Sequence, residues 1–217
     1  MGRTTKIVLA VWALALIGAG GWIAQDALLK PDAVATTEQR GFFSTDSASM
    51  IGGPFQLTDQ NGRKRSSDEF RGKLMLIYFG FTYCPDVCPT ALTVVTTALD
   101  QLGDQADAVV PILITVDPER DTPAVLKDYV AQFSPRYIGL TGSEREIAQV
   151  AKEFRVYYAK SPGSGGAPYL MDHTSLLYLM DQNGRFNTHF THNNRAEDIV
   201  AAVRKLLANP PKQAASN

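Results

Sequence analysis

The sequence predicts an α/β sandwich built on βαβ units, because segments with the pattern of strands alternate with segments with the pattern of helices. Residues 74–81 (LMLIYFGF) and 109–116 (VVPILITV) are continuous apolar runs, which is typical of strands buried on both faces. The 217 residues are 45% hydrophobic and 20% charged, as in an ordinary globular protein. A formal net charge of -1 leaves no basic excess and argues against a nucleic-acid partner.

Turn and cap residues predict the elements of the N-terminal half of this domain. Residues 55–64 alternate between apolar and polar side chains around an Asn-Gly turn, a pattern typical of a β-hairpin. Pro89 suits the first turn of a helix that residues 90–102 would continue. Pro111 has no backbone N–H to donate, so we expect it to mark the beginning of the second buried strand.

Capping signals and a second hairpin predict the C-terminal half. Thr122 and Pro123 have the residue types of an N-cap and a first helical residue, for a helix that runs through Phe133. Ser143 and Glu146 can form a capping box ahead of another helix. A flexible loop is predicted at residues 161–168 and a closing hairpin at residues 175–190. A last amphipathic helix is predicted at residues 195–207.

This order of elements is that of thioredoxin-like folds, in which the reactive cysteines follow a central strand directly. Cys84 and Cys88 do follow the first buried strand. We therefore predict a thioredoxin-like α/β sandwich over residues 51–208, with the first hairpin as an N-terminal extension and residues 209–217 as a flexible tail. The peptide dipoles at the start of the next helix would lower the pKa of a nearby thiol.

An N-terminal apolar segment predicts one transmembrane helix ahead of the domain. Residues 7–24 carry no charge and would span about 27 Å as a helix, close to the hydrocarbon thickness of a bilayer. Arg3 and Lys6 favour a cytoplasmic location for residues 1–6. The anchor would then lie in a bacterial inner membrane, and the rest of the chain would lie in the periplasm. We interpret the segment as an uncleaved anchor and residues 25–50 as a tether. The alternative is a signal peptide cleaved near the glycine-rich end of the segment.

The spacing of the two cysteines leaves three interpretations open. Cys84 and Cys88 are the only cysteines and are separated by three residues, not the two of a thioredoxin-type redox pair. A turn between them would permit a local disulfide, which needs Cα atoms within about 7 Å. The same loop can serve as a redox pair or present two thiolates to one metal ion. Pro85 and Pro89 stiffen the backbone, which suits a preformed site.

A histidine would decide between a disulfide and a metal site. His173 precedes a predicted strand that we expect beside the strand leading to the cysteines, so its side chain can face the sulfurs. His189 and His192 are expected at the surface. Two thiolates and one imidazole suit Cu(I), or Cu(II) with an added oxygen ligand. Structural zinc would need a closed fourth position, and no further cysteine can fill it.

Four segments together resemble the Sco/SenC family: GGPFQLTDQNG, GKLMLIYFGFTYCPDVCPTAL, ITVDPERDTP and YLMDHTSLLYLMDQNGRF. The resemblance covers residues 52–207. It implies a membrane-anchored, thioredoxin-like copper protein that takes part in assembling cytochrome c oxidase. It further implies that Cys84, Cys88 and His173 bind one copper ion. The copper would go to the CuA centre of oxidase subunit II, or the protein would reduce the cysteine disulfide of that centre before metal enters.

Three carboxylates are carried over from the same motifs as candidates to support the ligands. Asp86 lies inside CPDVCP and Asp172 inside DHT, where the alternatives are a turn cap and a solvated charge. Asp117 falls in the VDP loop, which in this topology should lie near the same edge of the sheet. The closing segment THFTHNN departs from the aromatic-glycine pattern of the family, so partner recognition at that end can differ.

Two functions from different classes follow. The first is a membrane-anchored copper chaperone for cytochrome c oxidase, whose copper binding is lost when Cys84 and Cys88 form a disulfide. The second is a thiol-disulfide oxidoreductase, with Cys84 as the attacking thiol and Cys88 as its partner. Other copper chaperones or thioredoxin-like reductants are candidate partners for either function.

Overall fold

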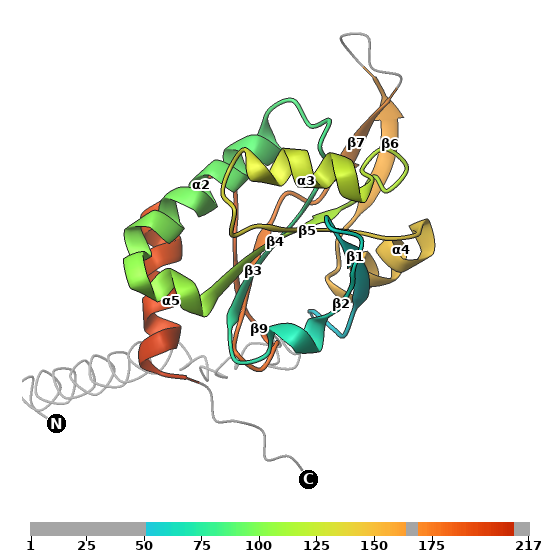
Figure 1. Cartoon of the computed structure of the whole chain (residues 1–217). Coiled ribbons are helices and arrows are strands. Elements are labelled where there is room, and N and C mark those ends of the chain that lie inside the picture. Colours follow the sequence, from blue (N-terminus) through green and yellow to red (C-terminus); the bar gives the residue numbers. More distant parts are fainter. Residues whose placement is uncertain (1–50, 164–168, 211–217) are drawn as a thin grey trace, which may run out of the picture. The chain divides into compact units, whose positions relative to one another are not determined.

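The computed structural model describes residues 51–163 and 169–210 (Figure 1). The predicted anchor and tether, and the predicted tail beyond residue 210, lie outside the described residues. None of the helices in the described part of the chain is both long and apolar enough to cross a bilayer.

A seven-stranded mixed sheet has the strand order β2-β1-β5-β4-β3-β8-β9. Its strands are β1 (Gln56–Asp59), β2 (Lys64–Ser66), β3 (Leu74–Gly80), β4 (Val109–Thr115), β5 (Ile138–Thr141), β8 (Leu177–Met180) and β9 (Phe186–Phe190). Strands β3, β4 and β5 run parallel to one another, and β8 runs antiparallel to β3. A separate two-stranded sheet contains β6 (Tyr158–Pro162) and β7 (Tyr169–His173). The βαβ units predicted from the alternating pattern are confirmed.

Strand β3 is the centre of the core. All seven of its residues are buried, because it is paired on both edges and covered on both faces. Its register with β4 runs from Leu74↔Val109 to Gly80↔Thr115, so both strands end at the same edge of the sheet. Burial of an apolar strand on both faces explains its continuous hydrophobic sequence.

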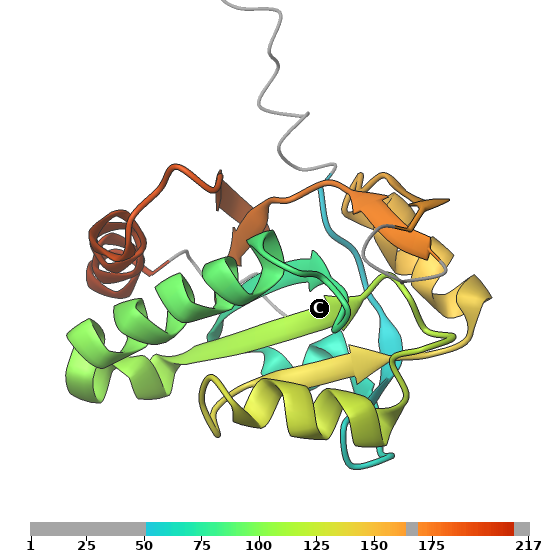
Figure 2. The same ribbon diagram turned by 90° about the horizontal axis from the view of Figure 1, so that it is seen from above.

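Helices α2 (Val87–Leu102), α3 (Pro123–Ala131), α4 (Glu144–Glu153) and α5 (Ala196–Ala208) flank the sheet. The units β3-α2-β4 and β4-α3-β5 step in one direction across the sheet, so right-handed crossovers put α2 and α3 on one face. Helix α5 lies beside α2 in both views (Figures 1 and 2). Phe154, which follows α4, packs against Phe79 of β3 with ring centroids 5.3 Å apart. Because Tyr78 faces α2 and neighbouring strand residues alternate, α4 covers the opposite face.

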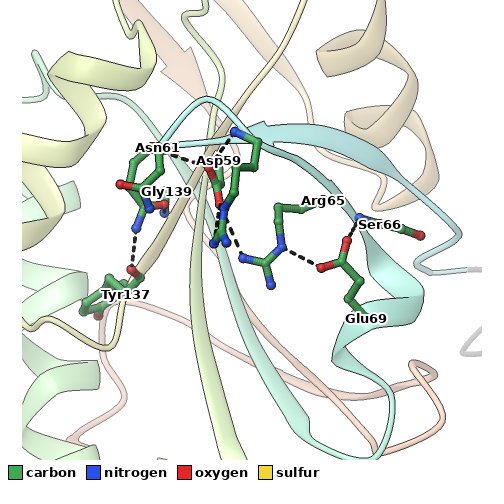
Figure 3. Close-up of polar contacts among 9 residues, drawn as sticks. Asp59, Asn61, Arg65, Ser66, Glu69, Tyr137 and Gly139 are labelled. Atoms are coloured by element: carbon green, nitrogen blue, oxygen red, sulfur yellow. Dashed lines mark hydrogen bonds and ion pairs between the residues drawn. The ribbon is translucent and has the colours of Figure 1, made fainter.

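The predicted N-terminal hairpin is confirmed and is tied to the sheet by its turn (Figure 3). The buried Asp59 carboxylate accepts backbone N–H bonds from Asn61 (2.9 Å) and Arg63 (3.0 Å) and contacts the Arg65 guanidinium (3.4 Å). Burial opposes the ionisation of Asp59, but these hydrogen bonds outweigh burial and lower its pKa. Gln60 bonds to the backbone around β5, to Tyr137 O and Gly139 N, at 3.1 and 3.0 Å.

Several sequence predictions need correction. Pro111 is the third residue of β4, not its start; β5 pairs with β4 only from Ile112 onward, so Pro111 has a strand on one side alone. The predicted loop at residues 161–168 begins too early, because Ser161 and Pro162 belong to β6 and pair with β7. The helix predicted to reach Phe133 ends at Ala131. Short strands β5, β6 and β7 were not predicted, because four or five residues carry little periodicity.

The capping box of α4 is confirmed and gives a stability prediction. Lys64 and Ser143 donate hydrogen bonds to Glu146 and lower the pKa of its carboxyl from 4.5 to about 2. A depressed native pKa stabilises the fold above the unfolded pKa, and this contribution is lost as the pH falls through the folded pKa. Glu146→Gln keeps an acceptor for Ser143 but removes the charge facing Lys64. We expect a loss of about 0.2–1 kcal/mol in the free energy of unfolding above pH 5.

Urea unfolding of Glu146→Gln and the wild type between pH 7 and 2 measures this contribution. The two stabilities should converge as the pH falls from 4.5 to 2. A difference that stays constant over this range would show that the charge of Glu146 is not its source.

Candidate metal centre

The two cysteines lie where β3 passes into α2. Cys84 follows the strand by four positions, and its N–H donates to Phe81 O at 3.3 Å. Cys88 is in the first turn of α2, and its N–H donates to Cys84 Sγ at 3.4 Å. Both side chains are buried, with 8% of Cys84 and none of Cys88 exposed, and both are free thiols. The helix start therefore points a backbone donor at the outer of the two sulfurs.

His173 approaches the sulfurs from a different part of the chain. It is the last residue of β7, and three residues separate it from β8, the neighbour of β3. Its Nε2 atom lies 3.7 Å from Cys88 Sγ, and its Nδ1 atom lies 3.2 Å from Thr174 O. A carbonyl oxygen only accepts, so Nδ1 donates to Thr174 O and Nε2 is the ring nitrogen that faces the cysteines. The rings of Tyr78 and Phe81 hold the imidazole edge-on, with centroids 6.1 and 5.8 Å away.

These three side chains form a cluster with metal-binding geometry. The ligand atoms of Cys84, Cys88 and His173 all lie within 4.8 Å of one another. Thiolate sulfur and imidazole nitrogen bind zinc at about 2.3 and 2.0–2.1 Å, so two ligand atoms on one ion of this size lie up to about 4.6 Å apart. Among residues 51–163 and 169–210, this is the one such group of histidine, cysteine and acidic side chains. Two sulfurs and one nitrogen form a soft donor set.

The two thiols have opposite pKa shifts because they share a hydrogen bond. A hydrogen bond from the Cys88 thiol lowers the pKa of Cys84 from 9.0 to about 4. Burial opposes this shift, and interactions with His173 and with the backbone N–H groups of Cys88 and Asp86 add to it. The same hydrogen bond, together with burial and the nearby Cys84 charge, raises the pKa of Cys88. The pair thus releases its first proton readily from Cys84 and holds the second on Cys88.

Gly80 lets the strand, the helix and a tyrosine meet beside Cys88. A Cβ atom at Gly80 would lie 2.9 Å from the Tyr78 ring and 3.0 Å from Cys88 Sγ. Tyr78 is buried on β3, and hydrogen bonding to its hydroxyl lowers the pKa of Cys88, against the larger opposing effects. Sequence analysis missed the contribution of both residues. The one signal in the sequence was a glycine at the end of an apolar strand.

The three supporting carboxylates lie outside the cluster. Asp86 is exposed at the N-cap position of α2, makes no side-chain cap, and accepts a 3.5 Å bond from Thr90 Oγ1. Asp172 is exposed and accepts from Ser161 Oγ at 3.1 Å. Asp117 is buried near the same edge of the sheet, where Tyr169 OH donates to it at 2.9 Å. Asp117 therefore contacts the strand that carries His173, not the ligands themselves.

A fourth carboxylate, Asp121, holds the loop before the cysteines and was not predicted. It is fully buried and accepts hydrogen bonds from Thr82 N (3.0 Å), Thr82 Oγ1 (2.6 Å) and Thr115 Oγ1 (2.6 Å). Burial raises the pKa of Asp121, although these hydrogen bonds oppose the shift. The loop between β4 and α3 is thereby fixed to the residue that precedes Tyr83 and Cys84.

The remaining histidines are exposed, as expected. His189 stacks on Phe186 in β9, with ring centroids 6.2 Å apart. His192 borders a cavity of about 210 Å³ between the first turns of α2, the start of β8 and the segment that leads into α5. Neither belongs to the cluster of Cys84, Cys88 and His173.

The fold and the site together define a class: a thioredoxin-like protein in which a histidine from a distant strand completes a cysteine pair. A model of the SCO1/SenC family matches residues 44–208, and the chain belongs to this family. A SCO2-like protein of Rickettsia prowazekii is 48% identical over 151 residues, which cover 69% of this chain and 74% of that protein.

Solved structures agree with this assignment. The structure of Bradyrhizobium japonicum ScoI with copper bound is 49% identical, with a TM-score of 0.66, and covers 71% of this chain and 98% of that one. A structure of BsSco is 27% identical, with a TM-score of 0.60, and covers 74% of this chain and 95% of that one. BsSco is a member of the Sco family of cytochrome c oxidase assembly proteins, and a disulfide switch was identified in it.

The low pKa of Cys84 predicts selective alkylation. In the reduced, metal-free protein, the rate of Cys84 modification by iodoacetamide should titrate with a midpoint near 4, far below the ordinary thiol value of 9.0. Cys88→Ala removes the main hydrogen-bond donor, so the midpoint should rise. Mass spectrometry of peptides alkylated at pH values from 3 to 10 measures both midpoints. A wild-type midpoint near 9 would contradict the shared hydrogen bond.

The close approach at Gly80 predicts an overpacked variant. Gly80→Ala should cost about 1–3 kcal/mol in the free energy of unfolding, because its methyl group meets the Tyr78 ring and Cys88 Sγ. Gly62→Ala is a control for lost backbone freedom at a site with open space around it, although its φ of +79° adds strain of its own. Urea unfolding gives the stabilities. If Gly80→Ala has the same free energy of unfolding as the wild type, the surrounding side chains accommodate the methyl group and the prediction is wrong.

Proposed function

We propose that this protein is a copper chaperone that binds one copper ion through the thiolates of Cys84 and Cys88 and Nε2 of His173. The observation that carries the proposal is the convergence of these three soft ligand atoms within 4.8 Å, in a family whose ScoI member has been solved with copper bound. Two thiolates and one imidazole satisfy Cu(I), which accepts low coordination numbers, and Cu(II) would take an added oxygen. The buried, preformed cluster favours a soft ion over Mg²⁺ or Ca²⁺, which prefer oxygen ligands.

The proposed destination of the copper is the CuA centre of cytochrome c oxidase subunit II. BsSco belongs to a family of cytochrome c oxidase assembly proteins, which supports an oxidase-related partner. We further propose that residues 7–24 anchor the chain in a bacterial inner membrane, with the copper domain in the periplasm. The uncharged segment and the cations before it support this placement. Other copper chaperones are candidate donors of the ion.

A second candidate function is reduction of a partner disulfide. The observation that favours it is the chemistry of Cys84, which is the less buried thiol and has a pKa lowered to about 4. The Cys84 thiolate would attack the partner disulfide, and Cys88 would then displace the partner thiol. The partner gains two electrons and two protons, and the product is a Cys84–Cys88 disulfide. A thioredoxin-like reductant would restore the thiols.

Replacement of the histidine separates the two functions. His173→Ala should weaken copper binding by more than the roughly 10–100-fold that loss of an outer hydrogen-bond partner causes, because a direct ligand is removed. The variant should retain most of its thiol-disulfide exchange. His192→Ala, an exposed histidine outside the cluster, is the matched control and should bind copper as the wild type does.

Competition with a chromophoric Cu(I) chelator gives the affinities, and X-ray absorption on the reduced domain gives the ligand set. One copper with two sulfurs and one nitrogen is expected for the wild type. Wild-type copper affinity in His173→Ala would exclude His173 as a ligand. Disulfide exchange without any copper binding in the wild type would favour the reductase.

A further inference from the structure

Arg120 connects the strand that carries His173 to the loop that carries the cysteines. It lies in the loop between β4 and α3, next to Asp121. Its Nε donates to the Asp117 carboxylate, and its Nη1 donates to Tyr169 O at 3.0 Å. The guanidinium also covers the Tyr169 ring, 3.8 Å from the centroid. Since Tyr169 is the first residue of β7, Arg120 contacts both the backbone and the side chain at the start of this strand.

The guanidinium also contacts the aromatic residues before the cysteines. It lies 5.0 Å from the centroid of Tyr83 and 5.9 Å from that of Phe81. Phe81 in turn packs edge-on against the His173 ring at 5.8 Å. One cation therefore bridges β7 and the cysteine loop, with Phe81 as the contact between that bridge and the imidazole.

Strand β7 needs such a contact because its own sheet is small. Within residues 51–163 and 169–210 it is paired only with β6, and these two strands share no ladder with the seven-stranded sheet. An isolated two-stranded hairpin is marginally stable in water. Figure 1 shows this pair beside the loops at one end of the main sheet. The place of His173, four residues or about 13 Å along the strand from Tyr169, must come from contacts outside the hairpin.

An arginine is required for this contact. Its planar group can stack on a ring with its face while it donates from its edge, which a lysine ammonium cannot do. Arg120 Nη2 is buried and has no hydrogen-bond partner among the described residues. Burial of an unpaired donor costs free energy, so the contacts of this arginine carry a local penalty.

We propose that Arg120 is a positioning residue that holds β7 against the cysteine loop and so keeps His173 in place to bind the metal ion. The copper part of this inference rests on the proposed function, whereas the placement of β7 can be tested without metal.

The central experiment compares Arg120→Lys with Arg65→Lys. Arg65 is the matched control, because it also pairs with a buried carboxylate, lies 5.0 Å over an aromatic ring and has a similar side-chain exposure, 18% against 22% for Arg120. It lies in the N-terminal hairpin, away from the cluster. Hydrogen exchange in the reduced, metal-free proteins should be at least tenfold faster at residues 169–173 in Arg120→Lys and unchanged there in Arg65→Lys.

Copper binding then tests whether the His173 imidazole keeps its position. Arg120→Lys should keep both sulfur ligands in X-ray absorption, show a weaker and more disordered nitrogen contribution than the wild type, and bind copper about 10–100-fold more weakly, as expected when a residue that orients a ligand is changed. Wild-type exchange at residues 169–173 together with an unchanged nitrogen ligand would overturn the proposal. If the wild type binds no copper, the proposed function fails, and the exchange experiment alone still decides the role of Arg120.

A second variant covers the case in which Arg120→Lys does not fold. Tyr83 is 53% exposed, so Tyr83→Leu should fold while it removes one of the rings under the guanidinium. Its residues 169–173 should exchange faster than those of the wild type, by less than in Arg120→Lys. No change in this variant would reject the bridge between the cysteine loop and β7.

Discussion

Burial of β3 on both faces is the constraint on which the rest of the structure depends. The strand can be fully apolar only because β4 and β8 flank it and helices cover both sides. Its end at Gly80 places the cysteine loop at the edge of the sheet and the first turn of α2 over that loop. Its pairing with β8 brings the segment after β7 to the same edge. The cysteine loop follows β3, and the segment with His173 leads into β8. Because β3 and β8 are paired, the cysteines and the histidine meet.

The chemistry of the cluster follows from this packing. Burial keeps water away from Cys88, so its proton is shared with Cys84 and not lost to solvent. The backbone N–H groups at the start of α2 favour the charge on Cys84. His173 donates from Nδ1 to Thr174 O, so its Nε2 atom faces the sulfurs. Backbone groups thus contact Cys84 Sγ and the His173 ring, which favours a preformed site.

The loop between β4 and α3 supports the site through two adjacent residues with different tasks. Asp121 accepts hydrogen bonds from Thr82, which fixes the approach to the cysteines, whereas Arg120 contacts β7 and the aromatic rings. Neither residue touches a ligand atom directly. The pairing of β3 with β8 brings the cysteine loop and the end of β7 to one edge of the sheet, and these contacts from a third segment support their approach.

The sequence by itself determined the βαβ pattern, the first hairpin, the capping box of Ser143 and Glu146, and the position of Cys84 and Cys88 at the start of a helix. These features depend on local periodicity, capping and turn chemistry. It also singled out His173 among three histidines. Only the tertiary structure decided the short strands β5, β6 and β7, the place of Pro111 inside β4, and the exposed positions of Asp86 and Asp172. It also decided the roles of Tyr78, Arg120 and Asp121. All of these features depend on contacts between residues far apart in the chain. Such contacts leave no periodic pattern of residue types in the sequence, so sequence analysis does not detect them.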